Sequence, residues 1–175
     1  NKEVVRMTSA LARLLRQSIS NDNERIPLQK EVDYAGSYLT IQKMRYKDKL
    51  EYEIEVDEDI KKEEIINLIL QPLVENAIYH GIKYKGSKGL IKIVGYGEDD
   101  KIILKVIDNG IGMDEAALKG IFDKSKESEG KNGVGVYNVQ TRICLYYGAE
   151  YGLCFESVLG QGTTATITIP RNFRE

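Results

Sequence analysis

The chain reads KIILKVIDNGIGM over residues 101–113. The change within this stretch from aliphatic residues to Asp and Gly decides how the whole sequence is interpreted. Residues 101–107 are mostly aliphatic and predict a strand with a buried face. Asp108 falls on that face, because strand side chains alternate with a period of two. Asp and Gly are both depleted in strands, so Asp108, Gly110 and Gly112 serve something other than strand stability.

Asp108 admits two interpretations. An ionised carboxylate only accepts hydrogen bonds and is costly to bury without a donor. The exocyclic amine of adenine is such a donor, whereas guanine presents a carbonyl there, so a buried Asp108 would select adenine. The alternative, which the residue alone favours, is that Asp108 caps a turn through its own backbone. Gly110 and Gly112 permit positive φ and let a ligand approach the backbone closely.

The composition is that of a globular chain. The 175 residues are 42% hydrophobic and 30% charged, with a formal net charge of -2, which fits one domain of ordinary size. The absence of a basic excess argues against nucleic acid as a main partner. No apolar run reaches the length of a membrane span. Cys144 and Cys154 lack the spacing of a zinc site and are expected to be reduced thiols in the core. Because the chain begins with Asn1 instead of Met, we expect a piece of a longer protein.

Two helices joined by a short loop are expected at the start of the chain. Residues 1 to about 20 carry apolar residues at helical spacing, and a second such stripe follows over residues 28–46. The polar stretch SISNDNERIP, residues 18–27, separates them and ends in proline. Glu31 and Asp33 fall in the first turn of the second helix, where the helix dipole favours acids. Each helix needs a partner for its apolar stripe, so we expect a hairpin.

The rest of the chain mixes strand and helix patterns. The expected strands span 50–57, 90–97, 101–108, 151–158 and 163–170, and the expected helices span 61–83, 114–122 and 136–147. Asp114 is expected to cap the short helix. Residues 123–132, DKSKESEGKN, are charged and unperiodic and predict a mobile loop, which at this length is more often functional than not. The predicted class is α+β, with one sheet covered by helices on one face.

Further candidate residues lie outside the opening stretch. Gly133 and Gly135 precede a predicted helix, and glycines before a helix N-terminus favour an anion site. Asn76 and His80 are four residues apart and would share one face of the predicted helix 61–83. The amide oxygen of Asn76 is a hard ligand that suits Mg²⁺. His80 is the only histidine in the chain, and a lone histidine is more often a packed or surface residue than a catalyst.

Three common nucleotide-binding patterns are missing from the sequence. No GxxxxGK[ST] occurs, no GxGxxG follows a strand in a strand, helix, strand unit, and the HRD and DFG triplets of protein kinases are absent. Any nucleotide site in this chain must therefore be of another type.

Five segments, taken in order, resemble the ATP-binding boxes of the GHKL fold. They are LQPLVENAIYHG (70–81), DNGIGM (108–113), Phe122, NGVGVYNVQTRI (132–143) and GQGTT (160–164). The stretch over residues 11–46 further resembles the sensor histidine kinases of the LytS and YesM type. The resemblance implies a two-layer α/β sandwich of the GHKL type over residues 47–175. Residues 1–46 would be the remnant of a helical hairpin that serves dimerisation and carries the phosphoacceptor.

The resemblance also implies how the boxes bind MgATP. Asp108 would hold the adenine amine, Asn76 would bind the Mg²⁺ ion that bridges the phosphates, and residues 123–132 would form a lid over ATP. Gly133 and Gly135 would bring backbone amides to the phosphates. Gly110 and Gly112 would shape the base pocket, and Gly162 with Thr163 would support the floor beneath Asp108. Further contacts with the nucleotide are implied for His80, Met113, Phe122, Val134 and Val136.

Several positions depart from the family pattern. Tyr79 stands where family members often have Lys, and Lys83 or the lid lysines would have to supply that charge. Pro72 stands where the hydrolases of the gyrase and Hsp90 type carry the Glu that activates water. Glu75 lies about a quarter turn from the Mg²⁺ ligand and is a poor replacement. ATP hydrolysis is therefore disfavoured, and Glu75 and His80 are only candidate catalytic groups.

The resemblance implies a histidine kinase that passes the γ-phosphate of ATP to a histidine on the hairpin and from there to a response regulator. The acceptor histidine is expected ahead of residue 1, so this fragment would bind ATP without phosphorylating itself. The parent protein is expected to be a homodimer through the hairpin, at a bacterial inner membrane, with this part in the cytosol. Two alternatives stay open: a GHKL serine kinase of the anti-sigma type, and a degenerate nucleotide-binding or dimerising scaffold.

Overall fold

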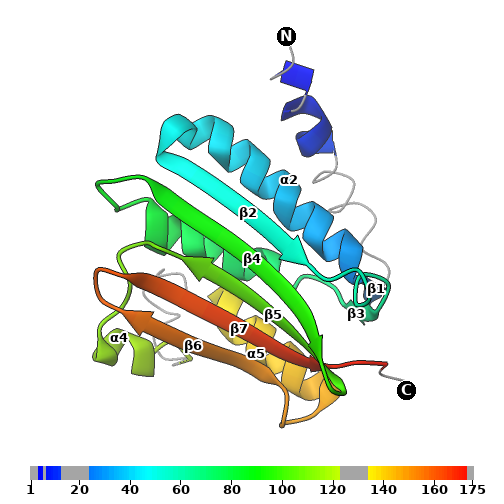
Figure 1. The fold of residues 1–175 in the computed structure, drawn as a ribbon. Coiled ribbons are helices and arrows are strands. Elements are labelled where there is room, and N and C mark those ends of the chain that lie inside the picture. Colours follow the sequence, from blue (N-terminus) through cyan, green and yellow to red (C-terminus); the bar gives the residue numbers. More distant parts are fainter. Residues whose placement is uncertain (1–3, 6, 13–23, 123–133, 173–175) are drawn as a thin grey trace.

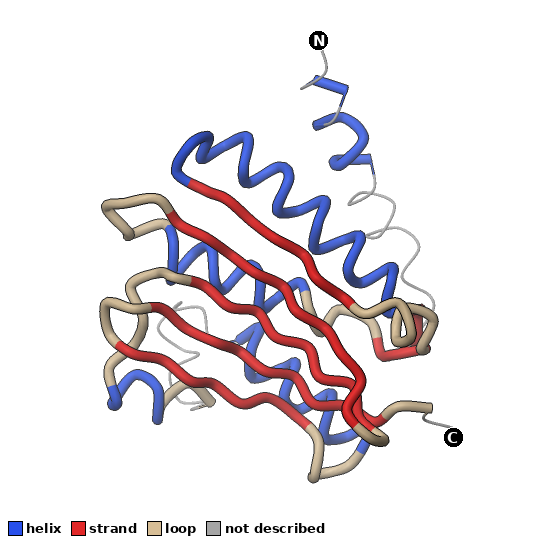
Figure 2. Tube along the Cα trace, viewed as in Figure 1, coloured by secondary structure: helices blue, strands red, loops and turns tan. Residues whose placement is uncertain are grey.

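The computed structural model describes residues 4–5, 7–12, 24–122 and 134–172. Its elements are β1 (Arg25–Pro27), α2 (Leu28–Tyr46), η1 (Lys47–Lys49), β2 (Leu50–Val56), β3 (Glu64–Ile66), α3 (Gln71–Asn76), η2 (Ala77–Ile82), β4 (Gly89–Glu98), β5 (Lys101–Asp108), α4 (Glu115–Lys119), α5 (Val134–Tyr147), β6 (Gly152–Val158) and β7 (Gly162–Pro170). In Figures 1 and 2, helices α2, α3 and α5 lie on one face of a sheet, and α4 lies at one end of it. This is the α+β sandwich that the sequence predicts.

The sheet places Asp108 in the middle of one end. Its five strands run in the order β2-β4-β5-β7-β6, so β5 is central. The pairing of β2 with β4 is parallel, and the other three pairings are antiparallel. At the end of β5, Asp108 stands opposite Ile91 of β4 and Thr163 of β7. The backbone of Asp108 is therefore flanked by a strand on each side.

The inner face of β5 belongs to a single hydrophobic core. Ile102 and Leu104 are fully buried, and they pack in one cluster with Leu28 and Leu39 of α2 and Ile143 of α5. Helix α2 is thus part of the same core as the sheet. The assignment of residues 1–46 to a dimerisation hairpin stays a prediction, because only residues 4–5 and 7–12 of its first helix are described and they are helical.

The predicted helix over residues 61–83 is wrong in its first ten residues. Glu64–Ile66 instead forms the short strand β3, which pairs with β1, a strand that the sequence did not predict. Leu68 follows with a positive φ of 55°, and α3 begins only at Gln71. The helical spacing of Ile65 and Ile69, four residues apart, was misleading. Both are buried, but Ile65 lies in a strand and Ile69 lies in the turn that follows it.

Apart from the first helix, of which only residues 4–5 and 7–12 are described, the other predicted elements are confirmed to within a few residues of their ends. Strand β5 spans the residues expected, and Asp114 caps α4 by accepting a hydrogen bond from the backbone of Ala117 at 2.7 Å. One correction concerns the cysteines. Both are free, but Cys154 is exposed and only Cys144 is half-buried, since Cys154 falls on the outward side of β6.

Strand β2 is an edge of the sheet and carries acids on its outer side. Glu53 and Glu55 are exposed, and Lys92 on β4 bridges them at 3.6 and 2.8 Å. Glu51, half-buried, pairs with Lys88 at 3.3 Å. The inner side of β2 begins with the fully buried Leu50, so the strict alternation of LEYEIEV divides core from solvent.

Candidate functional site

Asp108 is buried, as the alternation predicts, with 7% of its surface exposed. Its Oδ1 accepts a hydrogen bond from the backbone N–H of Gly110 at 2.8 Å. Burial raises the pKa of the carboxyl from 3.8 to about 6, although the N–H groups of Gly110 and Thr163 and the charge of Lys85 oppose the shift. The turn-capping interpretation is therefore confirmed, and a carboxylate with two oxygens can cap this turn and also accept from a ligand.

The backbone of η2 runs directly against the carboxylate. A Cβ on Gly81 would lie 2.6 Å from Oδ1 of Asp108, and a Cβ on Gly110 would lie 2.4 Å from the backbone of Gly81. Neither position can hold a side chain without displacing its neighbour. The carbonyl of Gly81 also accepts a hydrogen bond from the N–H of Ile111 at 3.1 Å. The segments 70–81 and 108–113 are thus joined at Gly81, Asp108, Gly110 and Ile111.

Gly162 forms the floor beneath Asp108. It has a φ of 120°, and a Cβ there would lie 2.0 Å from the carbonyl oxygen of Asp108. Gly112 packs as closely against the end of β6, since a Cβ there would lie 2.1 Å from the carbonyl oxygen of Val158. The segment 160–164 therefore packs under the segment 108–113, as the resemblance implies for Gly162.

Ser157 on β6 ties these turns together. Its hydroxyl accepts a hydrogen bond from the N–H of Met113 at 2.8 Å and donates to the carbonyl of Gly162 at 2.9 Å. It also lies 2.9 Å from the hydroxyl of Thr163. Met113 and Thr163, both half-buried, are thus brought together with Asp108 at this end of the sheet.

Asn76 ends α3, and a π-helix continues the chain. Asn76 is half-buried, and the N–H of Lys83 donates to the carbonyl of Ile78, five residues earlier, at 2.9 Å. Such π-turns often occur at functional sites. The shared face predicted for Asn76 and His80 assumed regular α-helical spacing, which the chain leaves at Ala77. His80 is exposed, while Asn76 is partly covered.

The side chains around His80 form an exposed aromatic and cationic group. The ring of His80 meets Tyr79 edge to face at 5.2 Å between centroids. The Lys83 ammonium lies 4.3 Å from the centroid of Tyr79 and 5.3 Å from that of Tyr84. Partial desolvation and the charge of Lys83 lower the pKa of His80 below its usual 6.5. His80 is therefore neutral at pH 7 and brings no positive charge to this surface.

Glu75 has its carboxylate engaged with a neighbour on its own helix. It is exposed, and its carboxylate accepts a hydrogen bond from the side chain of Gln71 at 2.8 Å. Its charge also helps to raise the pKa of Tyr38 on α2, after the larger effect of burial. The carboxylate is thus directed along α3 and towards α2.

The fourth segment reaches the site through the start of α5. A Cβ on Gly135 would lie 3.6 Å from the Cβ of Pro72, so α5 begins beside α3. Val136, in contrast, is buried in the core with 2% exposed. Phe122 packs edge to face on Phe155 of β6 at 5.7 Å between centroids. Gly133 and the predicted lid, residues 123–132, lie outside the described residues.

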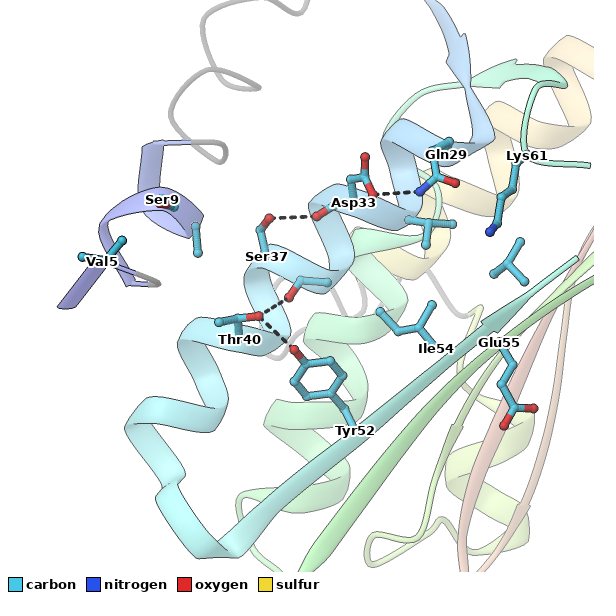
Figure 3. A pocket seen from close by; sticks show the side chains of 14 residues that line it. Val5, Ser9, Gln29, Asp33, Ser37, Thr40, Tyr52, Ile54, Glu55 and Lys61 are labelled. Atoms are coloured by element: carbon cyan, nitrogen blue, oxygen red, sulfur yellow. Dashed lines mark hydrogen bonds between the residues drawn. The ribbon is translucent and has the colours of Figure 1, made fainter. Parts of the chain in front are cut away.

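The structure has a cavity beside α2 and β2. Its volume is about 760 Å³, and Val5, Ser9 and Ala10 line its other side. Figure 3 shows side chains that line it. Its polar side chains bond to one another: Gln29 donates to Asp33 at 2.8 Å, and the hydroxyls of Thr40 and Tyr52 lie 2.9 Å apart. In the described part of the chain no cluster of acids, cysteines and histidine fits a metal ion. Among the same residues, no helix has the length and apolar character to cross a membrane.

Comparison with protein families decides the assignment. The model of the histidine kinase-, DNA gyrase B- and HSP90-like ATPases matches residues 61–172, a range that includes all the boxes described above. The chain belongs to this ATPase family. A second family model, histidine kinase, matches residues 1–50.

The relatives of this ATPase domain are sensor kinases. The sensor histidine kinase YesM of Bacillus subtilis is 35% identical over 97% of this chain and 28% of its own length. The sensor protein LytS of Staphylococcus haemolyticus is 33% identical over 85% of this chain and 25% of its own length. The chain thus spans about a quarter of these relatives. A solved histidine kinase domain from Erythrobacter litoralis EL346 has the same fold, with a TM-score of 0.60 at 18% identity over 96% of this chain and 74% of that chain.

Membership of the histidine kinase-type ATPases makes this an ATP-binding domain, and the sensor-kinase relatives do not favour the serine kinase alternative.

Two residues around Asp108 were missed in the sequence. Gly81 closes the segment 70–81, and its position there was a usable signal. Ser157 gave none, because a serine in an alternating strand is ordinary until the turns that it joins are known.

Proposed function

We propose that this chain is the ATP-binding catalytic region of a sensor histidine kinase. It presents the γ-phosphate of MgATP to a histidine in the part of the protein ahead of residue 1. The observation that carries the proposal is the buried carboxylate of Asp108, against which Gly81 and Gly110 bring backbone in place of side chains. A carboxylate with a raised pKa is held there at a cost to folding, which a ligand that donates to it would offset.

The residues at the end of β5 fit an adenine ring. Asp108 would accept the exocyclic amine, and the ionised form that accepts best predominates above pH 6. Gly81 and Gly110 let the backbone pack directly against this carboxylate, while Gly162 and Ser157 hold the turns beneath it. The ring would meet mainly backbone there, so selection would depend on shape and on one hydrogen-bonding edge.

Asn76 and the start of α5 would hold the phosphate end. Asn76 is half-buried at the end of α3, and Gly135 lies beside Pro72 where the two helices begin. The amide oxygen of Asn76 would bind Mg²⁺, and backbone N–H groups around Gly135 would bind phosphate oxygens. When bound, Mg²⁺ neutralises the phosphate charge. Lys83, held over Tyr79, would supply the positive charge that the family often takes from a Lys at that position.

The same residues favour transfer to a protein group over hydrolysis. Activating water needs a base within hydrogen-bonding reach of it. Glu75 is exposed and bonded to Gln71, Pro72 cannot act as a base, and His80 is directed to the exposed surface beside Tyr79. Phosphoryl transfer to a histidine depends mainly on positioning and charge, which this arrangement would provide.

The wider role follows from the relatives and extends the proposal. The phosphoryl group would pass from the histidine to a response regulator. The full protein would be a homodimer through the hairpin that includes residues 1–46, and it would lie at a bacterial inner membrane with this domain in the cytosol. Neither the transfer from ATP to the histidine nor the transfer to the response regulator involves nucleic acid.

Titration with MgATP tests the proposal. The wild-type chain is expected to bind, and Asp108→Asn is expected to weaken binding at least about tenfold, because it removes a charged acceptor from a buried site. Asp33→Asn, at the cavity of Figure 3, is the matched control and should bind normally. A wild-type chain that does not bind would support the scaffold alternative.

Phosphate chemistry distinguishes the two kinase alternatives. The longer natural protein, which includes the segment ahead of residue 1, should acquire an acid-labile and alkali-stable phosphate from ATP. An acid-stable phosphate would instead indicate transfer to serine and would contradict the histidine kinase assignment.

A further inference from the structure

Glu31 on α2 is a buried carboxylate that lies outside the ATP site. It is 1% exposed, and it accepts hydrogen bonds from three consecutive backbone N–H groups, those of Leu68 at 2.7 Å, Ile69 at 3.2 Å and Leu70 at 3.1 Å. The sequence suggested only that Glu31 suits the positive end of its own helix. In the structure its carboxylate instead accepts hydrogen bonds from a turn that lies 37 to 39 residues further along the chain.

The turn that Glu31 holds is strained. Leu68 has a φ of 55°, a left-handed conformation that a leucine rarely adopts and that must be stabilised by its surroundings. Arg142 on α5 also contacts this turn. Its guanidinium donates to the side-chain oxygen of Asn67 at 3.0 Å and, more weakly, to the carbonyl of Leu68 at 3.4 Å. Two helices, α2 and α5, therefore fix one short turn.

This turn sets the start of α3. The first carbonyl of the helix belongs to Leu70, which accepts from the N–H groups of Leu73 at 3.1 Å and Val74 at 3.2 Å. The N–H of Leu70 is one of the three that Glu31 holds. Asn76 is the last residue of the same helix. A shift or rotation of the turn is therefore carried along a single short helix to Asn76.

We infer that Glu31 is a positioning residue for the phosphate end of the ATP site, and that it acts by holding the strained turn at Leu68 so that α3 directs Asn76 to Mg²⁺. The inference rests on the proposed function, since it requires Asn76 to bind the metal. The adenine end depends less on this turn. Asp108, Ser157 and Gly162 belong to the sheet, and Gly81 is fixed separately by its bond with Ile111.

The test compares two ligands. In Glu31→Gln the side chain keeps its shape but loses its charge, and it turns one acceptor into a donor that faces backbone N–H groups. MgATP affinity should fall about tenfold, as for other groups that orient a metal ligand, while adenosine affinity should change less than about twofold on the same account. Equal weakening of both ligands, or no change in either, would overturn the inference. Binding by the wild-type chain tests the proposed function separately.

Two further variants keep the test independent of folding defects. Arg142→Gln loosens the turn from the α5 side and should give the same split between MgATP and adenosine, even if Glu31→Gln does not fold. Glu63→Gln is the matched control, because Glu63 is a partly buried acid that bonds Arg171 at 3.2 Å at the far end of the sheet. It should lower stability without weakening either ligand, and selective loss of MgATP in this control would contradict the inference.

Relief of the backbone strain should restore binding. Glycine adopts a φ near 55° without the steric penalty of leucine, so Leu68→Gly lets the turn form with less help from Glu31. The double variant Glu31→Gln, Leu68→Gly should therefore regain MgATP affinity relative to Glu31→Gln alone. If the double variant binds MgATP as weakly as the single one, the strained turn is not the link to Asn76.

Discussion

Replacing Asp108 by Asn should make the stability of the protein respond differently to pH. The carboxyl has a pKa of about 6 in the folded protein against 3.8 as its ordinary value. Because the folded-state pKa is the higher one, the stabilisation linked to proton binding is fully present below pH 3.8 and is lost as the pH rises through 6. Asn does not titrate, so the variant lacks this dependence.

The size of the effect follows from the two pKa values. Ionisation of a carboxyl with these values lowers the free energy of unfolding by about 1.4 kcal/mol between pH 5 and pH 8. Urea denaturation of both proteins at the two pH values measures it. The free energy of unfolding of wild type minus that of Asp108→Asn should be about 1.4 kcal/mol larger at pH 5 than at pH 8. A difference that is constant with pH, or that grows towards pH 8, would refute the account of Asp108 as a desolvated acid.

Three further outcomes are expected. Adenosine, which lacks the phosphates that themselves titrate near pH 6, should bind about tenfold more weakly at pH 5 than at pH 8, because a carboxyl with the pKa of Asp108 is then mostly protonated; calorimetry that shows no pH dependence would contradict this. Gly81→Ala should abolish nucleotide binding, since its Cβ would lie 2.6 Å from the carboxylate of Asp108, whereas Gly86→Ala, with no atom within 4 Å, should bind normally. Tyr147→Phe removes the acceptor for the buried N–H of Ile66 at 2.9 Å and should lower the free energy of unfolding by about 1 to 2 kcal/mol; unchanged urea denaturation would show that this bond contributes nothing.

Local patterns were sufficient to predict β5 and the burial of Asp108. The alternation of residues 101–107 is a property of neighbours in sequence, and it led correctly to one face and to one acid on it. Residues 61–70 show where such patterns fail. Ile65 and Ile69 are buried at helical spacing, but the turn at Leu68 is held by Glu31 from another helix. No local pattern contains that contact.

The glycines of the site show the same limit. Gly110 and Gly112 stood out because they follow a strand and an acid. Gly81 did not, because the group that requires a glycine there is the carboxylate of Asp108, which is distant in sequence and adjacent in space. The roles of Asn76 and the lid residues in binding stay predictions, since they concern a ligand and a segment outside the described residues.

The acids along β2 bear on how copies of this protein meet. A free strand edge invites another strand to extend the sheet, and charged side chains are one means of preventing it. If two copies joined through β2, Glu53 and Glu55 of each, both exposed, would come close to the same residues of the other. Their mutual repulsion, which Lys92 of each copy would offset only in part, would oppose such a joined sheet.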